Sequence, residues 1–317
     1  DKKISEKDGT NSAKFSRTFD YFIHTYSAIG TPATYVVRNR EGKEVRMLED
    51  NKGFKRCLTK FDLGKVEFFS FKNSRQDDLN GWMITPPDFD KNKKYPVFMY
   101  VYGGPGSQTV KDAWGGQNYA WFQMLAQKGY IIVSVDNTGT GARGEKFKKM
   151  TYKELGKYET QDQIEAAKYL ANLDYVDESR IGIFGWSYGG YMSSLCLFKG
   201  NDVFKAAIAV APVTNWRWYD SIYTERYMRT PRENKNGYEN NSPINFVNRL
   251  EGNYLLVHGI TDDNVHFQNT AEMAKALISA NKQFDTYFYP NRNHGIYGDN
   301  ARIHLYTKMT DFVLEKL

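Results

Sequence analysis

Short apolar runs recur along the chain from residue 97 onward. They lie at residues 97–102, 131–135, 181–184, 206–210 and 254–257. Strands that are apolar on both faces belong to a parallel sheet covered by helices. Three segments between or after these runs have apolar residues at helical spacing. They are residues 160–170, 267–280 and 302–316. Strands that alternate with helices predict an α/β fold with a mostly parallel, doubly wound sheet.

One helix start has a local signature. Thr-Gln-Asp-Gln at residues 160–163 matches a capping box, in which the first residue caps the helix. This pattern predicts that the helix begins at Thr160.

The first part of the chain has a different pattern. Residues 21–26, 33–37 and 45–48 are rich in β-branched and aromatic residues, and 39–43 has the composition of a hairpin turn. A sheet of so few strands is only marginally stable by itself. We therefore interpret these strands as the end of a larger β domain. Residues 66–71 and 81–84 look like antiparallel strands that precede the parallel ones. We therefore predict an all-β fragment over residues 1–55 and an α/β domain over 56–317.

Composition excludes several classes of protein. The chain of 317 residues is 41% hydrophobic and 25% charged, as in an ordinary soluble globular protein. No run approaches the roughly 18 apolar residues of a membrane helix. The first residues are too charged for a signal peptide, although a removed leader would leave no trace. The net charge of +6 is spread over a mixed surface, which argues against nucleic-acid binding. Cys57 and Cys196 are far apart and predict neither a disulfide scaffold nor a zinc site.

Gly-Trp-Ser-Tyr-Gly at residues 185–189 is the strongest chemical signal. It fits the G-x-S-x-G elbow, in which a nucleophilic serine sits on a tight turn from strand to helix. The context agrees, because an apolar strand leads into the motif and residues 191–195 can continue as a helix. The sequence therefore predicts a serine hydrolase of the α/β-hydrolase type, with Ser187 as the nucleophile.

A serine nucleophile needs a histidine base, and in this fold the base follows the acidic residue along the chain. His24 precedes the serine, His258 precedes the acidic pair, His266 follows that pair too closely, and His304 lies within the last helix. His294 instead lies in a loop between the strand at 284–289 and the last helix. A loop at the strand ends is where the mechanism requires the base, so we predict His294.

The acidic residue and the oxyanion donors are less sharply defined by spacing. Asp262 and Asp263 both follow the strand at 254–258, and spacing alone does not choose between them. The other carboxylate would be placed to cap the helix that starts near Phe267. An oxyanion hole needs two donors. The backbone N–H of Tyr188 is one, and the second is either the Tyr102 hydroxyl or a glycine N–H in the loop that follows it.

Four separated motifs together resemble the prolyl oligopeptidase family, and most closely its dipeptidyl peptidase IV branch. They are Gly-Trp-Ser-Tyr-Gly-Gly at 185–190, Val-Tyr-Gly-Gly-Pro-Gly-Ser-Gln at 101–108, residues 219–228 and residues 258–268. The resemblance runs from about residue 15 to the end of the chain.

The resemblance implies a role for each site residue. Ser187, Asp262 and His294 would form the catalytic triad, Tyr102 would donate its hydroxyl to the oxyanion, and Asn264 would hydrogen-bond a substrate carbonyl. The remaining residues would wall a pocket for the proline ring of the substrate: Tyr188, Val213, Trp216, Tyr219, Tyr223 and Val265. A flat, rigid ring suits an aromatic box. Tyr219 and Tyr223 are four residues apart and would share one face of a helix.

The implied activity is cleavage after a penultimate proline, with release of N-terminal dipeptides through an acyl-enzyme. Neither a metal nor an organic cofactor is needed. The resemblance also implies peptide substrates, a homodimer and a location outside the cytoplasm. The alternatives are a tripeptidyl peptidase or oligopeptidase of the same family, an esterase of the same fold that acts on small esters, and a binding protein without activity.

Two departures from the family pattern stand out. Family members carry an eight-bladed β-propeller ahead of the hydrolase domain, and residues 1–55 would be the tail of its last blade. The paired glutamates that hold the substrate's amino terminus lie in that propeller, so the dipeptidyl mode is left open here. Where relatives often have Asp-x-Arg-Gly, residues 136–139 read Asp-Asn-Thr-Gly. The role of that arginine is either lost or taken over by Arg143.

Overall fold

The computed structural model describes residues 3–5 and 7–317 as two compact units. The first unit comprises residues 1–66, 84–88 and 111–128, apart from the residues not described, and the second comprises 67–83, 89–110 and 129–317. Neither unit is continuous in sequence, so the predicted division after residue 55 stays a prediction.

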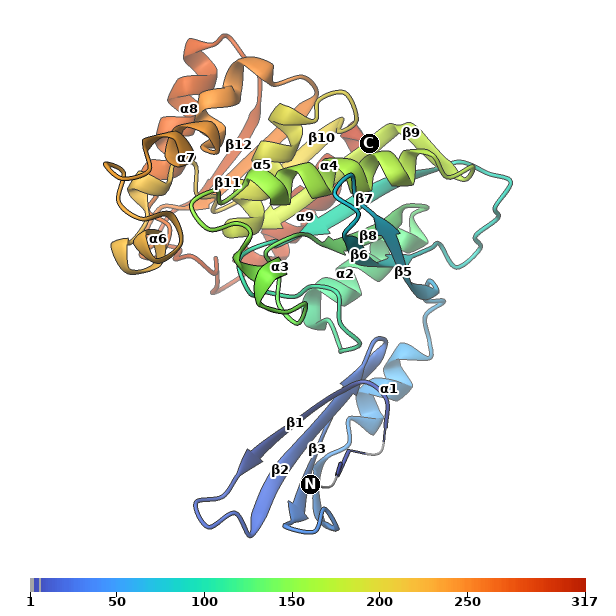
Figure 1. The fold of residues 1–317 in the computed structure, drawn as a ribbon. Coiled ribbons are helices and arrows are strands. Elements are labelled where there is room, and N and C mark those ends of the chain that lie inside the picture. The colour runs from blue at the N-terminus through green and yellow to red at the C-terminus, as the bar shows by residue number, and fades with distance from the viewer. Residues whose placement is uncertain (1–2, 6) are drawn as a thin grey trace. The chain divides into compact units, whose positions relative to one another are not determined.

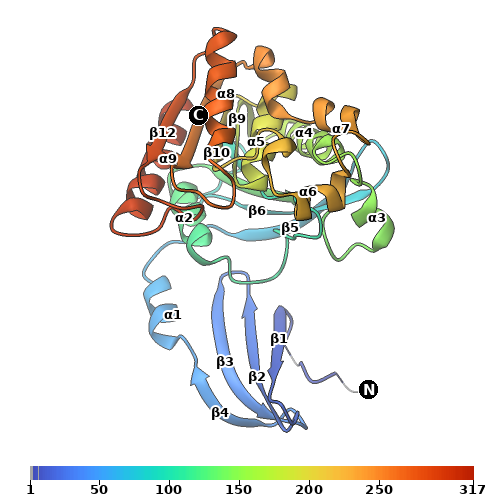
Figure 2. The ribbon, with the colours of Figure 1, turned by 90° about the vertical axis from the view of Figure 1, so that its left-hand side faces the viewer.

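The first unit contains a four-stranded antiparallel sheet (Figure 2). Its strands are β1 (Thr10–Phe15), β2 (Tyr21–Ala28), β3 (Thr31–Asn39) and β4 (Glu44–Glu49), each paired with the next in the chain. The predicted turn at 39–43 is confirmed, and it is closed by a bond from the Gly42 N–H to the Asn39 carbonyl, 2.8 Å. Four strands in a meander are the arrangement of a propeller blade. The helices α1 (Lys52–Leu58) and α2 (Gly116–Gln127), which were not predicted, belong to the same unit.

An eight-stranded sheet forms the centre of the second unit (Figure 1). Its order is β12-β11-β10-β9-β7-β8-β6-β5, and the pairings from β8 through β7 and β9 to β12 are parallel. The predicted mostly parallel sheet is therefore confirmed. The strands are β5 (Val66–Lys72), β6 (Asp78–Ile84), β7 (Tyr95–Val101), β8 (Ile131–Asp136), β9 (Val176–Trp186), β10 (Ala206–Val210), β11 (Asn253–Gly259) and β12 (Asp285–Tyr289).

The strand order fixes where a ligand site belongs. The chain passes from β7 to β8 on one side, then returns to place β9 on the other side of β7. In open α/β sheets, ligands bind outside the carboxyl ends of the strands at such a switch point. Tyr102 follows the end of β7 and Ser187 follows the end of β9, so both lie at the switch point.

Helices cover both faces of this sheet. The helices α4 (Lys157–Ala171) and α5 (Tyr188–Lys199) lie on one face and α9 (Ala301–Lys316) on the other (Figure 1). The unit also contains α3 (Glu145–Lys149), α6 (Ser221–Met228), α7 (Lys235–Asn240), α8 (Gln268–Ser279) and the 3₁₀ helices η1 (Trp216–Trp218) and η2 (Pro243–Arg249). The predicted helices at 267–280 and 302–316 are confirmed by α8 and α9. Within the described part of the chain, no helix combines the length and apolarity needed to cross a bilayer.

The predicted capping box at Thr160 is wrong. The helix α4 begins at Lys157, after Gly156 at φ 88°. Thr160, Asp162 and Gln163 are buried inside the helix. Gln163 donates to the Val135 carbonyl, and Asp162 accepts the Thr138 N–H, at 2.8 and 2.7 Å. Asp162 and Gln163 therefore anchor the end of β8 and the loop after it instead of capping their own helix.

Candidate active site

Ser187 occupies a strained turn between β9 and α5. Its φ of 61° lies in the left-handed region, which residues other than glycine rarely adopt. A Cβ at Gly185 would lie 2.1 Å from the Gly189 carbonyl oxygen, and one at Gly189 would lie 2.2 Å from the Val101 carbonyl oxygen. Backbone atoms cannot give way at such distances, so both glycines are required. The structure thus has the tight turn that the elbow motif predicts.

His294 and Asp262 form a hydrogen-bonded pair beside this turn. The distance from His294 Nδ1 to Asp262 Oδ2 is 2.7 Å. The indole N–H of Trp186, the residue before Ser187, donates to the His294 carbonyl at 3.0 Å, which ties the histidine loop to the turn. Because the carboxylate accepts the proton of Nδ1, the other ring nitrogen, Nε2, is left as a proton acceptor.

Asp262 is held by donors on both of its oxygens. Oδ1 accepts the backbone N–H groups of Asn264 and Val265, each at 2.9 Å. Oδ2 accepts from His294 and lies 3.1 Å from Nε2 of His258. Burial raises the pKa of Asp262, but the hydrogen bonds from the two histidines, the charge of His294 and the Asn264 N–H together hold this pKa well below its usual range.

The structure also distinguishes the two candidate carboxylates. Asp262 is buried and bonded to His294, whereas Asp263 is exposed and lines a surface hollow with Tyr219 and His266. The suggestion that the second carboxylate caps the helix near Phe267 is wrong, because no side chain caps the start of α8. Oδ1 of Asp262 accepts backbone N–H groups of its own turn, which leaves Oδ2 facing His294. Asp262, and not Asp263, is therefore the carboxylate that faces the histidine loop.

His258 is a site residue that sequence reasoning missed. It is fully buried at the end of β11. Its Nε2 donates to the Val265 carbonyl at 2.8 Å and lies next to Asp262, and its Nδ1 accepts from the Thr270 hydroxyl at 2.7 Å. It was passed over because it precedes the acidic pair and cannot be the base. Its position four residues before Asp262 is the signal that could have identified it as a support for that carboxylate.

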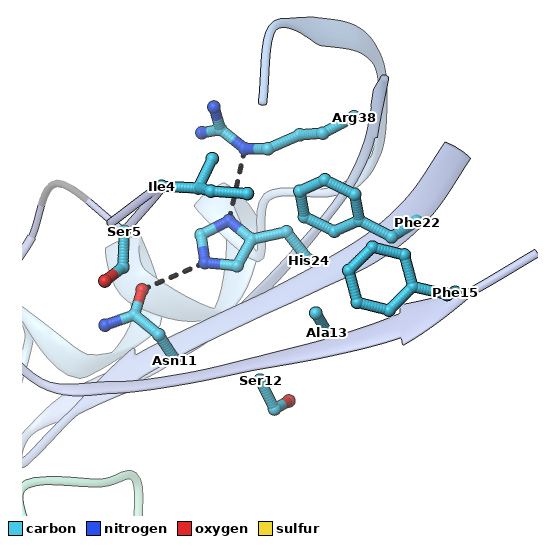
Figure 3. A pocket seen from close by; sticks show the side chains of 9 residues that line it. All are labelled: Ile4, Ser5, Asn11, Ser12, Ala13, Phe15, Phe22, His24 and Arg38. Carbon is cyan, nitrogen blue, oxygen red and sulfur yellow. Dashed lines mark hydrogen bonds between the residues drawn. The ribbon is translucent and has the colours of Figure 1, made fainter. Parts of the chain in front are cut away.

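Two other histidines, His24 and His304, have partners outside the candidate site. His24 on β2 lies between Asn11 and Arg38 (Figure 3). Arg38 Nε donates to its Nδ1, so its Nε2 donates to the Asn11 amide oxygen, and both ring nitrogens are used. Burial first, and the charges of Arg38 and Lys7 next, lower the pKa of His24. His304 in α9 bonds the Tyr289 hydroxyl at 2.8 Å.

Two donor groups lie at the carboxyl ends of β7 and β9. Tyr102 follows β7, and its ring lies 6.0 Å from that of Tyr188. Burial, and then the nearby Tyr227, raise the pKa of Tyr102, which keeps its hydroxyl protonated and able to donate. Tyr188 is the first residue of α5, so its backbone N–H has no partner within the helix. Both groups have the chemistry of oxyanion-hole donors.

Aromatic rings gather next to Ser187. Trp216 lies 5.4 Å from Tyr188, 5.8 Å from Tyr219 and 5.9 Å from Tyr223, measured between ring centroids. Tyr188 and Trp216 are buried, as are Val213 and Val265. We call Tyr188, Trp216, Tyr219 and Tyr223 the aromatic box.

Asn264 reaches the edge of the aromatic box. The Tyr219 hydroxyl donates to its amide oxygen at 2.8 Å, so the Asn264 NH₂ group is turned to donate elsewhere. The expectation that Tyr219 and Tyr223 share one helix is wrong, because α6 begins at Ser221 and Asp220 caps it. Their rings still meet edge to face at 5.4 Å, because Tyr219 lies in the extended turn that leads into the cap.

The segment at 136–139, which departs from the family pattern, is contacted by an arginine from a distant part of the sequence. Arg75, between β5 and β6, donates to the Thr138 hydroxyl at 2.8 Å and pairs with the buried Asp162 at 2.5 Å. Arg143, the substitute suggested from sequence, instead lies over the Phe147 ring at 4.8 Å. No sequence spacing connects residue 75 to residue 138, so this contact was not predictable. Among the described residues, no group of three His, Cys, Asp or Glu side chains could hold a metal ion.

Comparison with known proteins gives consistent matches. Residues 117–317 match the model of the prolyl oligopeptidase family. The chain is 42% identical over 308 residues to prolyl endopeptidase FAP of Bos taurus. It is 40% identical over 309 residues to dipeptidyl peptidase 4 of Felis catus. Each match covers 95% of this chain and 40% of the relative. The crystal structure of Porphyromonas gingivalis dipeptidyl peptidase 4 superposes with a TM-score of 0.96 at 48% identity, over 100% of this chain and 45% of that one. The chain thus spans about two fifths of the length of these curated relatives.

Proposed function

Since the chain belongs to the prolyl oligopeptidase family, we propose that it is the catalytic part of a serine peptidase that cleaves after a penultimate proline and releases N-terminal dipeptides. The observation that carries this proposal is the aromatic box, which begins at the residue after the strained serine and has the Asn264 amide at its rim. The box supplies selectivity for proline and the elbow supplies the nucleophile.

The proposed reaction is acyl transfer by Ser187, His294 and Asp262. Nε2 of His294 takes the proton of the Ser187 hydroxyl as the oxygen attacks the carbonyl carbon after proline. The Tyr102 hydroxyl and the Tyr188 N–H stabilise the oxyanion that forms. His294 then gives its proton to the leaving amine, and a water molecule releases the acyl group by the same steps in reverse. The chain's own side chains supply every proton transfer.

Substrate binding in this proposal uses the box and its rim. The proline ring lies among Tyr188, Trp216, Tyr219 and Tyr223, with Val213 and Val265 closing the buried end. A ring with few rotatable bonds loses little entropy when it binds between rigid aromatic walls. The Asn264 NH₂ group donates to a substrate carbonyl, and its orientation for this is fixed by the bond from the Tyr219 hydroxyl.

A second candidate is endopeptidase action after proline. It is favoured by the similarity to proteins named prolyl endopeptidase FAP, at 42% identity. The two candidates differ in whether a free amino terminus is needed. We propose further that the full protein acts outside the cytoplasm as a homodimer, which rests on the family resemblance.

A pair of substrates separates the two candidates. The full-length protein is assayed with Gly-Pro-p-nitroanilide carrying either a free or an acetylated amino terminus. Dipeptidyl action predicts turnover of the free form only, and equal turnover of both forms would refute it in favour of endopeptidase action. A protein that hydrolyses short-chain nitrophenyl esters but neither peptide would be an esterase instead.

Tyr219→Ala is expected to weaken binding of proline more than of alanine at the penultimate position. The loss of an aromatic contact of about 1.4 kcal/mol corresponds to a rise in KM of about tenfold for the proline substrate. The measurement is KM for matched Gly-Pro and Gly-Ala peptides. Tyr287→Ala serves as the control, since Tyr287 lies on β12 beside His304, away from the aromatic box. An equal rise for both peptides would place the box elsewhere.

A further inference from the structure

Glu159 is a buried carboxyl group that the proposed reaction does not use. It lies in the first turn of α4 with none of its surface exposed. One carboxyl oxygen accepts the hydrogen of the Tyr188 hydroxyl at 2.7 Å. The other, Oε2, has no hydrogen-bond partner among the described residues. A fully buried carboxyl group is costly, so packing alone does not account for this residue.

Glu159 lies at the hydroxyl end of Tyr188, a member of the aromatic box. The titratable groups that face it are the phenols of Tyr188 and Tyr191 on α5 and of Tyr223 on α6, and the Asp162 carboxylate on its own helix. Burial raises the pKa of Glu159 to about 7, although the backbone N–H groups of Gly156 and Glu159 and the Tyr188 hydroxyl favour the charged form. Among the described residues, the Glu159 carboxyl group is thus the acceptor of the Tyr188 hydroxyl behind the box.

Tyr188 connects this carboxyl group to the reacting centre. Its backbone follows Ser187, and its ring packs against Tyr102 at 6.0 Å, Trp216 at 5.4 Å and Tyr191 at 5.3 Å. This packing restrains the Tyr188 ring but leaves its hydroxyl end to be fixed by a polar partner. The short, directional hydrogen bond to Glu159 fixes that end of the ring.

We infer that Glu159 is a positioning residue for substrate selection: by holding the Tyr188 hydroxyl it fixes the ring against which the substrate's proline lies. The inference rests on the proposed function, because it concerns the proline pocket of that function. It assigns the preference for proline partly to a carboxyl group that does not touch the substrate. A displacement of about 1 Å at such a wall is enough to change a rate about 100-fold.

Three variants of the full-length protein test this inference. Glu159→Leu removes the acceptor at similar volume, Glu159→Gln keeps an acceptor oxygen, and Tyr188→Phe removes the same bond from its other end. Each is assayed for kcat and KM on Gly-Pro-p-nitroanilide and Gly-Ala-p-nitroanilide. Thermal melting and labelling of Ser187 by a fluorophosphonate show which variants are folded with a reactive serine.

The expected result is a selective loss. Glu159→Leu lowers kcat/KM about 30-fold for the proline peptide and no more than about threefold for the alanine peptide. The reason is that only the proline ring packs against the Tyr188 ring that Glu159 holds in place. Glu159→Gln stays within about threefold of the wild type on both peptides, because its carbonyl accepts the same hydrogen bond. Tyr188→Phe behaves like Glu159→Leu, and the double variant is no worse than either single one, since both remove one shared interaction.

Two kinds of failure are distinguishable. A wild-type protein that does not cleave the proline peptide would refute the proposed function. If the wild type cleaves it, equal losses on both peptides in Glu159→Leu and Tyr188→Phe would show a purely structural role and overturn the inference. Additive losses in the double variant, or a Glu159→Gln variant as selective as Glu159→Leu, would overturn it as well. If Glu159→Leu does not fold, Tyr188→Phe and Glu159→Gln decide between the same outcomes.

Discussion

Ser187→Ala is expected to lower kcat for proline peptides by about 10⁶-fold, because removal of a triad nucleophile leaves only the oxyanion donors and binding. The fold should persist, since the Ser187 side chain makes no capping hydrogen bond to α5 and alanine is smaller. The strained φ of 61° remains in the variant, so no strain is relieved or added. The variant should therefore melt within a few degrees of the wild type.

The measurement is single-turnover and steady-state hydrolysis of Gly-Pro-p-nitroanilide, together with fluorophosphonate labelling. Ser279→Ala is the matched control, because Ser279 is an exposed serine at the end of α8. The control should keep full activity and full labelling. Residual activity of Ser187→Ala above a few per cent of the wild type would show that another group is the nucleophile.

Asp262→Asn is expected to lower kcat about 10⁴-fold with little change in KM. Oδ1 of the wild-type carboxylate accepts two backbone N–H groups, so the amide oxygen of the variant takes that place and its NH₂ group faces the histidines. An NH₂ group at that point donates to Nδ1 of His294, which moves the ring proton to Nε2 and removes the base. Asp263→Asn, one residue further on and exposed, is the control and should stay within about threefold of the wild type, as surface substitutions usually do.

The same substitution should change the dependence of stability on pH. The pKa of Asp262 is lower in the folded protein than in the unfolded chain, so the carboxylate stabilises the fold above the unfolded pKa, which is about 3.9. That contribution is lost as the pH falls through the unfolded value towards the folded one. Thermal melts from pH 6 downward should therefore show a smaller decline for Asp262→Asn than for the wild type. Parallel curves for the two proteins would contradict the donor arrangement around Asp262.

The sequence was sufficient for the sheet and for the position of the serine. Continuous apolar strands and a glycine-framed serine are local patterns, so both can be identified along the chain without knowledge of the packing. Chain order also disfavoured four of the five histidines as the base, and the choice of His294 stays a prediction. Spacing alone could not choose between Asp262 and Asp263, since that choice depends on which way one turn aims its carboxylates, and only the family resemblance implied Asp262.

The features that sequence reasoning missed are contacts between distant segments. Arg75 reaches Thr138 and Asp162 across the sheet edge, and no pattern along the chain links them. The polar residues at 160–163 resembled a helix cap because the same residue types bond equally well to a neighbouring loop. Glu159 lies just before the predicted helix start at Thr160, and no pattern along the chain marks it as buried. Only the packed structure shows that its side chain points inward.

The donors around Asp262 limit which groups can accept a proton during turnover. With two amides on one oxygen and two imidazoles at the other, this carboxylate has no lone pair to spare for a proton at any stage. His258 is equally occupied, because its ring bridges Val265 and Thr270. Chemistry would thus run on a single mobile hydrogen, shuttled between the serine oxygen, one imidazole nitrogen and the departing amine. The acidic limb of a rate profile should then follow one ionisation rather than a cooperative pair.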